Sequence, residues 1–458
     1  MTPDARHIAL TILTDSEKNR VVLDQSLNKF SKNLEKLSKK DRALANSIIF
    51  GTLRFREKLD WTIRPFSNKK IKEIDPSVIW AIRIALFQIM FMDKIPTSAA
   101  VNTAVNMVKI ISGRGAANFT NAVLRKASKN YIDVQPPDKL KDPDLFISIE
   151  KSMPLWLIKR WIKQHGFEST LQLCDTINSV PVITIRANTL KTDRDTLFKL
   201  IENDVKNACF TQYARDGISF TNPSRPIHLF ESFTEGLFQV QDQAAQITTI
   251  LLEPQPGENI LDACAGNGGK TAHIAQLMLN QGKIFAIDTS SQRLFNLDKE
   301  IKRLNLKIVE TKQTDILRYE DKSFKKAFDR VFVDAPCSGL GVLRRNPDAK
   351  WNKTHKDIKR LAAKQKRILL KAADFVKPGG YLLYSVCSLE TEENEQVIKS
   401  FLEQNKEFIV DKNLADISLG DTEKTLSKPF FTDQGFFKSF PYAPFMDGFF
   451  VARLIKKK

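Results

Sequence analysis

The sequence has few cysteines and few histidines, and this scarcity argues against two common ways of stabilising a fold. Its 458 residues include five cysteines and five histidines. An odd cysteine count without framework spacing argues against a disulfide scaffold and for a reducing compartment, so we expect a cytoplasmic protein. Because there is no C-x-x-C pair, the sequence also argues against a zinc site, and we expect no bound metal.

Long hydrophobic runs, repeats and low-complexity tracts are also missing from the sequence. No apolar stretch approaches the roughly 18 residues that a membrane span needs. The first residues, MTPDARHIALTILTD, do not have the pattern of a signal peptide. We therefore expect a protein that does not act at a membrane, with roughly two to four domains for a chain of this length.

Positive charge, in contrast, is abundant and unevenly distributed. The formal net charge is +18, and the first 141 residues carry 25 Lys and Arg against 13 Asp and Glu, so +12 of this charge lies in the first third. Clustered cations gain affinity for polyanions by releasing counterions from phosphates. The asymmetry predicts a nucleic-acid-binding module in this part of the chain, and a generally basic surface or an anionic membrane patch is the alternative.

The pattern of apolar residues divides the chain into four parts. Residues 1–130 show helical spacing only, interrupted at Gly113-Arg114-Gly115, and residues 131–144 form a proline-rich linker. Residues 145–237 read as a small α+β domain. From 238 to 458, and most clearly after Gly257, strands alternate with helices, which predicts an α/β domain with a parallel, doubly wound sheet. Its strands are expected to end near Leu261, Ile287, Val309, Val333 and Tyr384.

A glycine-rich turn and two acids suggest a nucleotide-like ligand in the last domain. The strand Asn259 to Asp262 leads into ACAGNGGKT, which has neither the G-x-G-x-x-G nor the Walker spacing. Glycines allow a ligand to approach the backbone closely, and the helix that follows offers free N–H groups. Asp288, at the tip of the second strand, can accept both hydroxyls of a ribose, and Asp315 can accept from an adenine amino group. The combination fits S-adenosylmethionine, although NAD-binding folds share the pattern and Asp288 could instead cap a helix.

Two cysteines follow predicted buried strands, Cys337 in RVFVDAPCSG and Cys387 in GGYLLYSVCS. Ligands bind outside the carboxyl ends of such strands, although buried cysteines often serve only as small apolar residues. Carbon-5 of a pyrimidine becomes nucleophilic only after a thiolate adds to carbon-6, so paired thiols fit pyrimidine methylation. Asp334 can hold the N3 and amino edge of a cytosine that has left its stack.

These motifs resemble those of the RsmB/NOP family of RNA cytosine-carbon-5 methyltransferases. The matching strings are DACAGNGGKT, DAPCSGLGVLRRNPDAKW, YSVCSLETEENE, VQDQAAQ and DGFFVARL. In addition, DRALANSIIFGTLR, IPTSAAVNTAVNMVK and NFTNAVLRK resemble the helical NusB-like RNA-binding domain, a fusion typical of the bacterial 16S rRNA enzymes. The resemblance covers essentially the whole chain. It implies a Rossmann-like methyltransferase fold with an all-α NusB-like N-terminal domain and a small α+β middle domain.

The resemblance also implies roles for individual residues. Cys387 matches the family nucleophile, Cys337 the cysteine that helps to release the RNA adduct, and Asp334 the acid that binds the cytosine edge. The cofactor, S-adenosylmethionine, is expected to contact residues of the glycine turn and the strand ends: Cys264, Ala265, Gly266, Asn267, Gly268, Gly269, Lys270, Asp288, Arg293, Asp315 and Asp334. Lys270 is also expected to reach the active site, and Arg344, Arg345 and Asp348 match a segment on the RNA side. Gly266-Asn267 stands where the family commonly has Ala-Pro, and Val386 where it has threonine.

The expected function is therefore methylation of 16S rRNA at cytosine 967 by a monomeric enzyme. Three alternatives remain open: a transfer RNA substrate, a non-catalytic RNA-binding assembly factor, and attack by Cys337 as in the DNA enzymes. Arg186 and Asn188 are candidate RNA contacts of the middle domain, and Trp156 and Trp161 are expected to pack in its core. His273 and His355 are expected at the surface or as helix caps rather than as catalytic bases.

Overall fold

Packing contacts divide the chain into two units in this computed structural model, which describes residues 4–417, 430–441 and 446–458. The first unit comprises Met1–Ser179 and Leu343–Asn352, and the second comprises Val180–Val342 and Lys353–Lys458. This division groups the helices between 143 and 178 with the N-terminal part, whereas the sequence suggested a boundary at 145. The four-part division remains our proposal for the folding domains.

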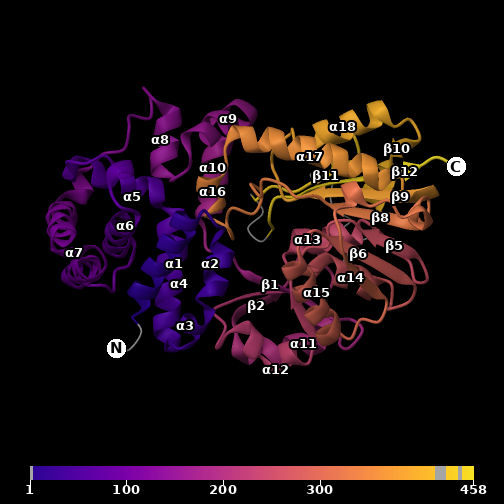
Figure 1. The fold of residues 1–458 in the computed structure, drawn as a ribbon, viewed down its shortest axis with the longest axis horizontal. Coiled ribbons are helices and arrows are strands. Elements are labelled where there is room, and N and C mark those ends of the chain that lie inside the picture. The colour runs from indigo at the N-terminus through magenta and orange to yellow at the C-terminus, as the bar shows by residue number, and fades with distance from the viewer. Residues whose placement is uncertain (1–3, 418–429, 442–445) are drawn as a thin grey trace. The chain divides into compact units, whose positions relative to one another are not determined.

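The first unit is helical throughout its described length (Figure 1). Its helices are α1 (Ala5–Asn19), α2 (Leu23–Lys29), α3 (Ser31–Glu35), α4 (Lys39–Arg54), α5 (Arg56–Ile63), α6 (Pro76–Phe91), α7 (Thr97–Asn130), α8 (Pro143–Glu150), α9 (Leu155–His165), α10 (Phe167–Asn178) and α16 (Ala349–Asn352).

Helix α6 forms the centre of this unit because its sequence, PSVIWAIRIALFQIMF, is apolar on nearly every side. Asp75 caps its first turn by accepting from the Ser77 amide, and Pro76 suits the first helical position. Helices α1, α4, α5 and α7 pack around it. Within α7, Gly113 has φ 85° and ψ 179°, so the predicted helix break is confirmed.

The segment Leu343–Asn352 belongs to the first unit although it follows the Cys337 loop in the sequence. The Lys350 ammonium donates to the carbonyls of Arg54 and Ser152 and to Oδ1 of Asn178. The Trp351 indole donates to the Leu53 carbonyl at 2.8 Å. The loop that carries Cys337 therefore continues directly into a segment packed within the helical unit.

The second unit contains two sheets. The smaller is antiparallel, in the order β2-β3-β1-β4, and is covered by short helices. Its elements are β1 (Ile183–Ala187), α11 (Arg194–Ile201), β2 (Lys206–Phe210), β3 (Gly217–Thr221), α12 (Glu231–Thr234) and β4 (Phe238–Val240).

The larger sheet has the order β10-β12-β9-β8-β5-β6-β7, with β11 paired to β12. Strands β5 to β9 are parallel, as predicted, whereas β10, β11 and β12 pair antiparallel at one side. The elements are α13 (Gln243–Ile250), β5 (Asn259–Asp262), α14 (Gly269–Leu277), β6 (Lys283–Asp288), α15 (Ser291–Leu304), β7 (Val309–Gln313), β8 (Phe328–Asp334), α17 (His355–Ala373), β9 (Val376–Val386), α18 (Glu395–Gln404), β10 (Phe408–Val410), β11 (Phe437–Lys438) and β12 (Phe450–Lys456).

Alternating side chains bury both faces of the parallel strands. Val331 and Val333 belong to one apolar cluster with residues of α17 and α18, whereas Phe332, between them, belongs to another with residues of α13 and α14. Figure 1 shows α17 and α18 on one side of this sheet and α13, α14 and α15 on the other. This layering places the carboxyl ends of the parallel strands along one edge.

Strand β7 does not lie where the sequence predicted it. The third parallel strand, β7, begins at Val309, where the sequence suggested that it ends. Of its residues, Val309 and Thr311 are half-buried and the rest are exposed, so the apolar alternation that marks a buried strand is weak there.

In the part of the chain that the structure describes, no helix is both long and apolar enough to cross a membrane.

Candidate active site

The candidate site lies where the parallel strands of the large sheet end. Strands β5, β6 and β8 finish at Asp262, Asp288 and Asp334, and β9 finishes one residue before Cys387. Because β8 and β9 are neighbours in parallel register, with Asp334 opposite Ser385, the loops after them are adjacent. The sheet topology thus brings together the two cysteine motifs and the acids identified from the sequence.

The two cysteines are in contact. The Sγ atoms of Cys337 and Cys387 lie 3.3 Å apart, and both cysteines are free. The hydrogen bond with Cys387 and burial raise the pKa of the Cys337 thiol well above its usual value, as do the nearby charges of Cys387 and Glu393. The direction of this shift favours a protonated Cys337 thiol, and at 3.3 Å either sulfur can donate a hydrogen bond to the other.

Glu393 links the two cysteine loops. Its carboxylate accepts from the Ser338 amide at 2.9 Å and from the hydroxyls of Ser338 and Ser388, each at 2.5 Å. The Gln365 amide of α17 donates to the same carboxylate at 3.0 Å. Glu393 is fully buried, and Ser338 and Ser388 directly follow the two cysteines. The carboxylate therefore fixes the two sulfur-bearing loops against each other.

Two glycines allow the backbone of these loops to pack closely. The Gly341 amide donates to the Cys387 carbonyl at 3.0 Å, and the Gly448 amide donates to the Gly341 carbonyl at 2.9 Å. A Cβ on Gly341 would lie 2.0 Å from the Gly448 carbonyl oxygen. A side chain at this position would therefore push the Cys387 loop out of place.

Lys270 and Asp334 form an ion pair beside the cysteines. Lys270 Nζ lies 2.6 Å from Asp334 Oδ2, and the Ser385 hydroxyl donates to Oδ1 at 2.9 Å. Burial lowers the Lys270 pKa, but the charge and hydrogen bond of Asp334 and the charge of Cys387 outweigh it, so the net pKa is raised. Lys270 is thus a stable cation, with two further N–H groups available to a substrate.

The glycine turn after β5 forms a cradle next to Asp288. Gly266 and Gly268 have φ of +57° and +83°, a region that favours glycine. A Cβ at Gly266 or Gly269 would meet nothing within 4 Å, so open space lies above the turn. Asp288 accepts from the amides of Gly266 and Ser290 at 2.9 and 2.8 Å, which leaves part of its lone-pair capacity for a ligand.

Asp262 and Cys264 occupy the buried base of the same turn. Burial raises the pKa of the Asp262 carboxyl to about 7; the Thr271 hydroxyl bonded to it opposes this shift, and the Asp334 charge adds to it. Burial, together with the charges of Asp262, Asp334 and Asp288, raises the pKa of the Cys264 thiol, which therefore stays protonated. Cys264 therefore contributes an uncharged thiol to the lining of the site.

These residues fit S-adenosylmethionine. Asp288 and Asp315 follow adjacent strands, where carboxylates can accept from ribose hydroxyls and from an adenine amino group. Asp315 is half-buried and accepts from the Leu317 amide at 3.0 Å. Arg293 lies 4.0 Å from Asp288 and is largely exposed, and Asn267 is exposed and accepts from Asn296. The cradle above Gly266 and Gly269 leaves room for the methionine portion.

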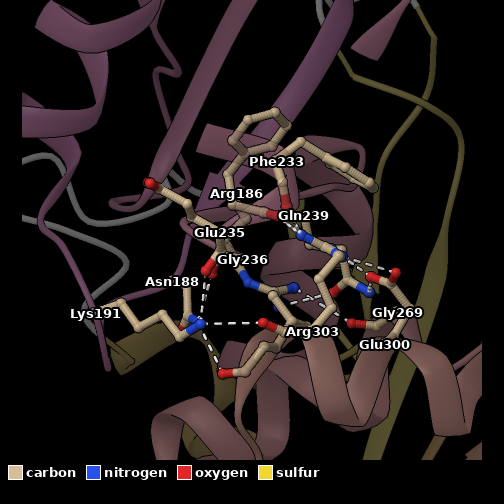
Figure 2. A network of polar contacts seen from close by, with 12 residues as sticks. Arg186, Asn188, Lys191, Phe233, Glu235, Gly236, Gln239, Gly269, Glu300 and Arg303 are labelled. Atoms are coloured by element: carbon tan, nitrogen blue, oxygen red, sulfur yellow. Dashed lines mark hydrogen bonds and ion pairs between the residues drawn. The ribbon is translucent and has the colours of Figure 1, made fainter. Parts of the chain in front are cut away.

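A buried arginine network joins the small sheet to this cofactor turn (Figure 2). The Arg186 guanidinium, 1% exposed, donates to Gln239 at 3.0 Å, to the Gly269 carbonyl at 3.3 Å and to Gln241. Burial lowers its pKa to about 9. Asn188, 2% exposed, donates to the carbonyls of Gly236 and Leu304. The suggestion that Arg186 and Asn188 contact RNA is therefore wrong, because both hold the interior of this unit together.

Lys191 and Arg303 complete the network in Figure 2. Lys191 donates to the carbonyls of Glu235 and Arg303, at 2.7 and 3.0 Å. Arg303 donates to the carbonyls of Phe233 and Phe238 and pairs with Glu300. Lys191, from the segment after β1, thus bonds to a carbonyl of α15, and Arg303 of α15 bonds to carbonyls beside the small sheet, which fixes that sheet relative to α15.

The expected RNA-side residues lie in the first unit. Arg344 and Asp348 are 2% and 8% exposed, and Asp348 accepts from the Leu23 amide at 3.1 Å. Arg345 is half-buried. Burial assigns Arg344 and Asp348 to packing within the helical unit rather than to a surface that faces RNA.

Two other expectations concern aromatic and histidine residues. Trp161 is fully buried and Trp156 half-buried, so Trp161 packs in a core as expected, but in that of the first unit. His273 is 1% exposed, which contradicts a surface position; its ring bonds to the Thr249 hydroxyl, and burial lowers its pKa. His355 is exposed at the start of α17, as expected.

Sequence reasoning did not single out Asp262, Ser385 or Glu393. Each lies within a string that was recognised, DACAGNGGKT or YSVCSLETEENE, but without an assigned role. Asp262 and Ser385 lie at strand ends, beside residues that were identified, so their positions offered a signal. For Glu393 the signal was weak, because the same stretch contains Glu390, Glu392 and Glu395 as well.

Comparisons with known proteins agree with this geometry. The family model described as 16S rRNA methyltransferase RsmB/F matches residues 249–455. The NusB family model matches residues 3–129, and the ferredoxin-like domain of RsmF/B-like methyltransferases matches residues 153–228. These matches confirm the expected fold class, with its Rossmann-like catalytic part and NusB-like helical part.

Individual relatives match over nearly the whole chain. The probable ribosomal RNA small subunit methyltransferase B of Bacillus subtilis is 34% identical, covering 99% of this chain and 98% of its own. Ribosomal RNA small subunit methyltransferase B of Escherichia coli is 33% identical over 92% of each chain. A crystal structure of a methyltransferase homolog protein from Pyrococcus horikoshii has a TM-score of 0.57 at 27% identity, covering 69% of this chain and 99% of its own. Another solved structure covers 100% of both chains with a TM-score of 0.83 at 25% identity.

Proposed function

Because the chain belongs to the 16S rRNA methyltransferase RsmB/F family of S-adenosylmethionine-dependent RNA methyltransferases, we propose that it methylates carbon-5 of a cytosine in small-subunit ribosomal RNA. The observation that carries this proposal is the contact between Cys337 and Cys387, 3.3 Å apart, beside the Lys270–Asp334 pair. The target position is cytosine 967, which the proposal takes from the family resemblance.

The first chemical step is attack by Cys387 on carbon-6 of the cytosine. The new sulfur–carbon bond pushes the electron pair of the carbon-5–carbon-6 double bond toward carbon-5, which becomes nucleophilic. The Lys270 ammonium stays charged beside this sulfur, because the charges of Asp334 and Cys387 help to raise its own pKa. Bound S-adenosylmethionine supplies the electrophilic methyl group that carbon-5 attacks.

Asp334 and Lys270 orient the base during this attack. Asp334 accepts from Lys270 and Ser385 and retains lone pairs for the cytosine amino group. The free N–H groups of Lys270 can donate to an acceptor on the same ring. A base reaches these groups only after it leaves its stack, so we expect the target nucleotide to be extruded from the RNA.

Release requires loss of the carbon-5 proton to a base and departure of the Cys387 sulfur with its bonding electrons. The protonated Cys337 thiol, adjacent to that sulfur, can donate a hydrogen bond to the departing thiolate. This gives the two cysteines unequal roles: Cys387 forms the bond and Cys337 helps to break it. Attack by Cys337 is disfavoured by its raised pKa.

The proposed partner of the enzyme is folded ribosomal RNA. The basic NusB-like part and the small sheet hold folded rRNA, largely through shape and phosphates. The enzyme acts as a cytoplasmic monomer. A non-catalytic assembly factor would not need an intact cysteine pair with its lysine, acid and cofactor turn.

Labelling of RNA tests this function. Purified protein is incubated with methyl-labelled S-adenosylmethionine and either protein-free 16S rRNA or bulk transfer RNA, and the modified nucleotide is identified and mapped. We expect 5-methylcytidine in 16S rRNA at cytosine 967 and none in transfer RNA. Label in transfer RNA alone would contradict the substrate, and label on another atom would contradict the chemistry.

A further inference from the structure

A cavity of about 740 Å³ lies in the first unit, formed entirely by residues between Glu17 and Arg83. Its inner wall comes from α1, α5 and α6, and the loop after α5 forms its rim. The volume is within the range of sites that hold a small organic ligand, and it far exceeds what a single inorganic anion fills. Nothing in the proposed methyl transfer uses this cavity.

The inner wall contains an ion pair, Glu17–Arg83, whose two members are too far apart to form a hydrogen bond. Asp60 accepts from Arg83 Nε and Nη2 at 2.7 and 2.8 Å. Glu17 lies 3.6 Å from Arg56 and 3.8 Å from Arg83, too far for hydrogen bonds. The facing atoms of that ion pair, Arg83 Nη1 and Glu17 Oε2, lie 3.8 Å apart, and both are buried without a hydrogen bond among the described residues. Buried polar atoms in this state are costly unless a ligand satisfies them.

The rim is strongly basic. Lys69, Lys70 and Lys72, together with Arg64, are exposed and line the cavity. Across the whole lining, six cations (Arg56, Arg64, Lys69, Lys70, Lys72 and Arg83) face two carboxylates (Glu17 and Asp60), a net charge of +4. The inner charges largely compensate one another, so most of the excess lies at the rim. The arrangement suits a ligand with a neutral polar end and an anionic end.

We propose that this cavity binds one nucleotide of single-stranded rRNA, with its base inside and the flanking phosphates on the lysine rim. The Watson–Crick edge of every nucleobase carries both donors and acceptors, which match the Glu17 carboxylate, whose side chain is 34% exposed, and the neighbouring arginines. The Arg56 guanidinium lies 5.5 Å from the centres of the Trp80 and Trp351 rings, and a base can contact the 24% of its side chain that stays exposed. Single-strand recognition commonly combines base stacking with phosphate contacts. The inference rests on the proposed RNA substrate and adds a second contact to it.

Binding of RNA to rim variants provides the first test. The full-length protein with Lys69→Gln, Lys70→Gln and Lys72→Gln is compared with a control carrying Lys36→Gln, Lys39→Gln and Lys40→Gln. The control loses the same charge from exposed positions of the same unit, outside the cavity. We expect the rim variant to bind protein-free 16S rRNA at least about tenfold more weakly, and its salt slope to fall by roughly 2 relative to the control. Equal weakening of RNA binding in the rim variant and in the control would contradict the proposal that the cavity binds RNA.

Glu17→Gln separates base recognition from simple attraction of phosphate. If the cavity only attracts phosphates, removing a negative charge strengthens RNA binding. If Glu17 accepts a hydrogen bond from a base, the glutamine side chain of the variant loses part of that acceptor capacity. We then expect RNA binding to weaken roughly threefold to tenfold with an unchanged salt slope. Stronger binding of Glu17→Gln would overturn the base-binding part of the proposal.

Crosslinking locates the RNA independently of affinity. RNA that carries 4-thiouridine is irradiated with the wild-type protein, and we expect crosslinked peptides from residues 56–83. Crosslinks confined to other parts of the chain would contradict the inference. The wild-type protein is assayed for methyl transfer in parallel. Crosslinking at 56–83 without methylation would contradict the proposed function and leave the RNA site intact, whereas methylation without such crosslinks would do the reverse.

Discussion

Cys337 and Cys387, 50 positions apart in the chain, meet with their sulfur atoms 3.3 Å apart. They meet because β8 and β9 are adjacent parallel strands, so that the loops after them leave the sheet at the same edge. Their environments differ, since the bond to Cys387, together with burial, raises the pKa of Cys337. This asymmetry is the structural basis for giving the two thiols different tasks.

Glu393→Gln should impair catalysis by loosening both cysteine loops. The amide has a single acceptor oxygen for the donors that the carboxylate now serves, so the change should cost about 2–3 kcal/mol of unfolding free energy. We expect kcat for RNA methylation to fall about tenfold to a hundredfold, because small misplacements of reacting groups are expensive. Steady-state kinetics and thermal melting measure the two effects.

The matched control for that change is Glu395→Gln. Glu395 lies in the same acidic stretch but pairs with Lys438 rather than with the cysteine loops. We expect kcat to change less than about threefold, because among the described residues the Glu395–Lys438 pair makes no hydrogen bond to either cysteine loop. Equal losses of kcat in both variants would show that the Glu393 bridge has no special role.

Asp288→Asn should weaken cofactor binding. Asp288 is placed for the ribose and also holds the Gly266 amide, and hydrogen bonds to a charged group contribute about 1.5–3 kcal/mol. We expect affinity for S-adenosylmethionine, measured by calorimetry without RNA, to fall about tenfold to a hundredfold. Asp298→Asn, which alters the acceptor of the Thr311 hydroxyl instead, should bind the cofactor nearly normally. Unchanged affinity in Asp288→Asn would contradict the assigned site.

Asp262 predicts a dependence of stability on pH. Its folded pKa is raised to about 7 from 3.8, so between these values the folded state binds more protons than the unfolded state. Stability should therefore be greatest below about pH 4 with respect to this group and should fall as pH rises to about 7, by on the order of 4 kcal/mol.

Asp262→Asn should remove this contribution, because the amide is neutral at every pH and its oxygen can still accept from Thr271. Urea unfolding of the wild type and the variant between pH 5 and pH 8 measures the difference. We expect the variant to gain stability relative to the wild type as pH rises. Parallel curves would show that the Asp262 pKa is not raised in the folded protein.

The sequence predicted the catalytic sheet well because its signals are local. A buried strand followed by glycines or by a rigid Asp-Ala-Pro turn is visible in a few consecutive residues, as at Asp262 and Asp334. Strand β7 was misplaced because its residues, VETKQ, are polar and largely exposed. The break at Gly113 followed from the interruption of helical spacing by glycine.

Contacts between residues that lie far apart in the chain could not be predicted from the sequence. Arg186 looked like a surface RNA contact, and only the folded chain shows its guanidinium among glutamines and the Gly269 carbonyl. Likewise, nothing local shows that Lys350 returns to the helical unit to bond the Arg54 carbonyl. Charged residues are rarely buried, so sequence reasoning assigns them to surfaces unless their partners are known.

The most direct test of the account compares Cys387→Ala and Cys337→Ala in the presence of S-adenosylmethionine and 16S rRNA. Product formation and protein–RNA adducts that survive denaturing gels are measured together. The account predicts that Cys387→Ala forms neither 5-methylcytidine nor adduct, whereas Cys337→Ala accumulates a stable adduct because release is impaired. Methylation by Cys387→Ala, or adduct formation that depends on Cys337 instead, would contradict it.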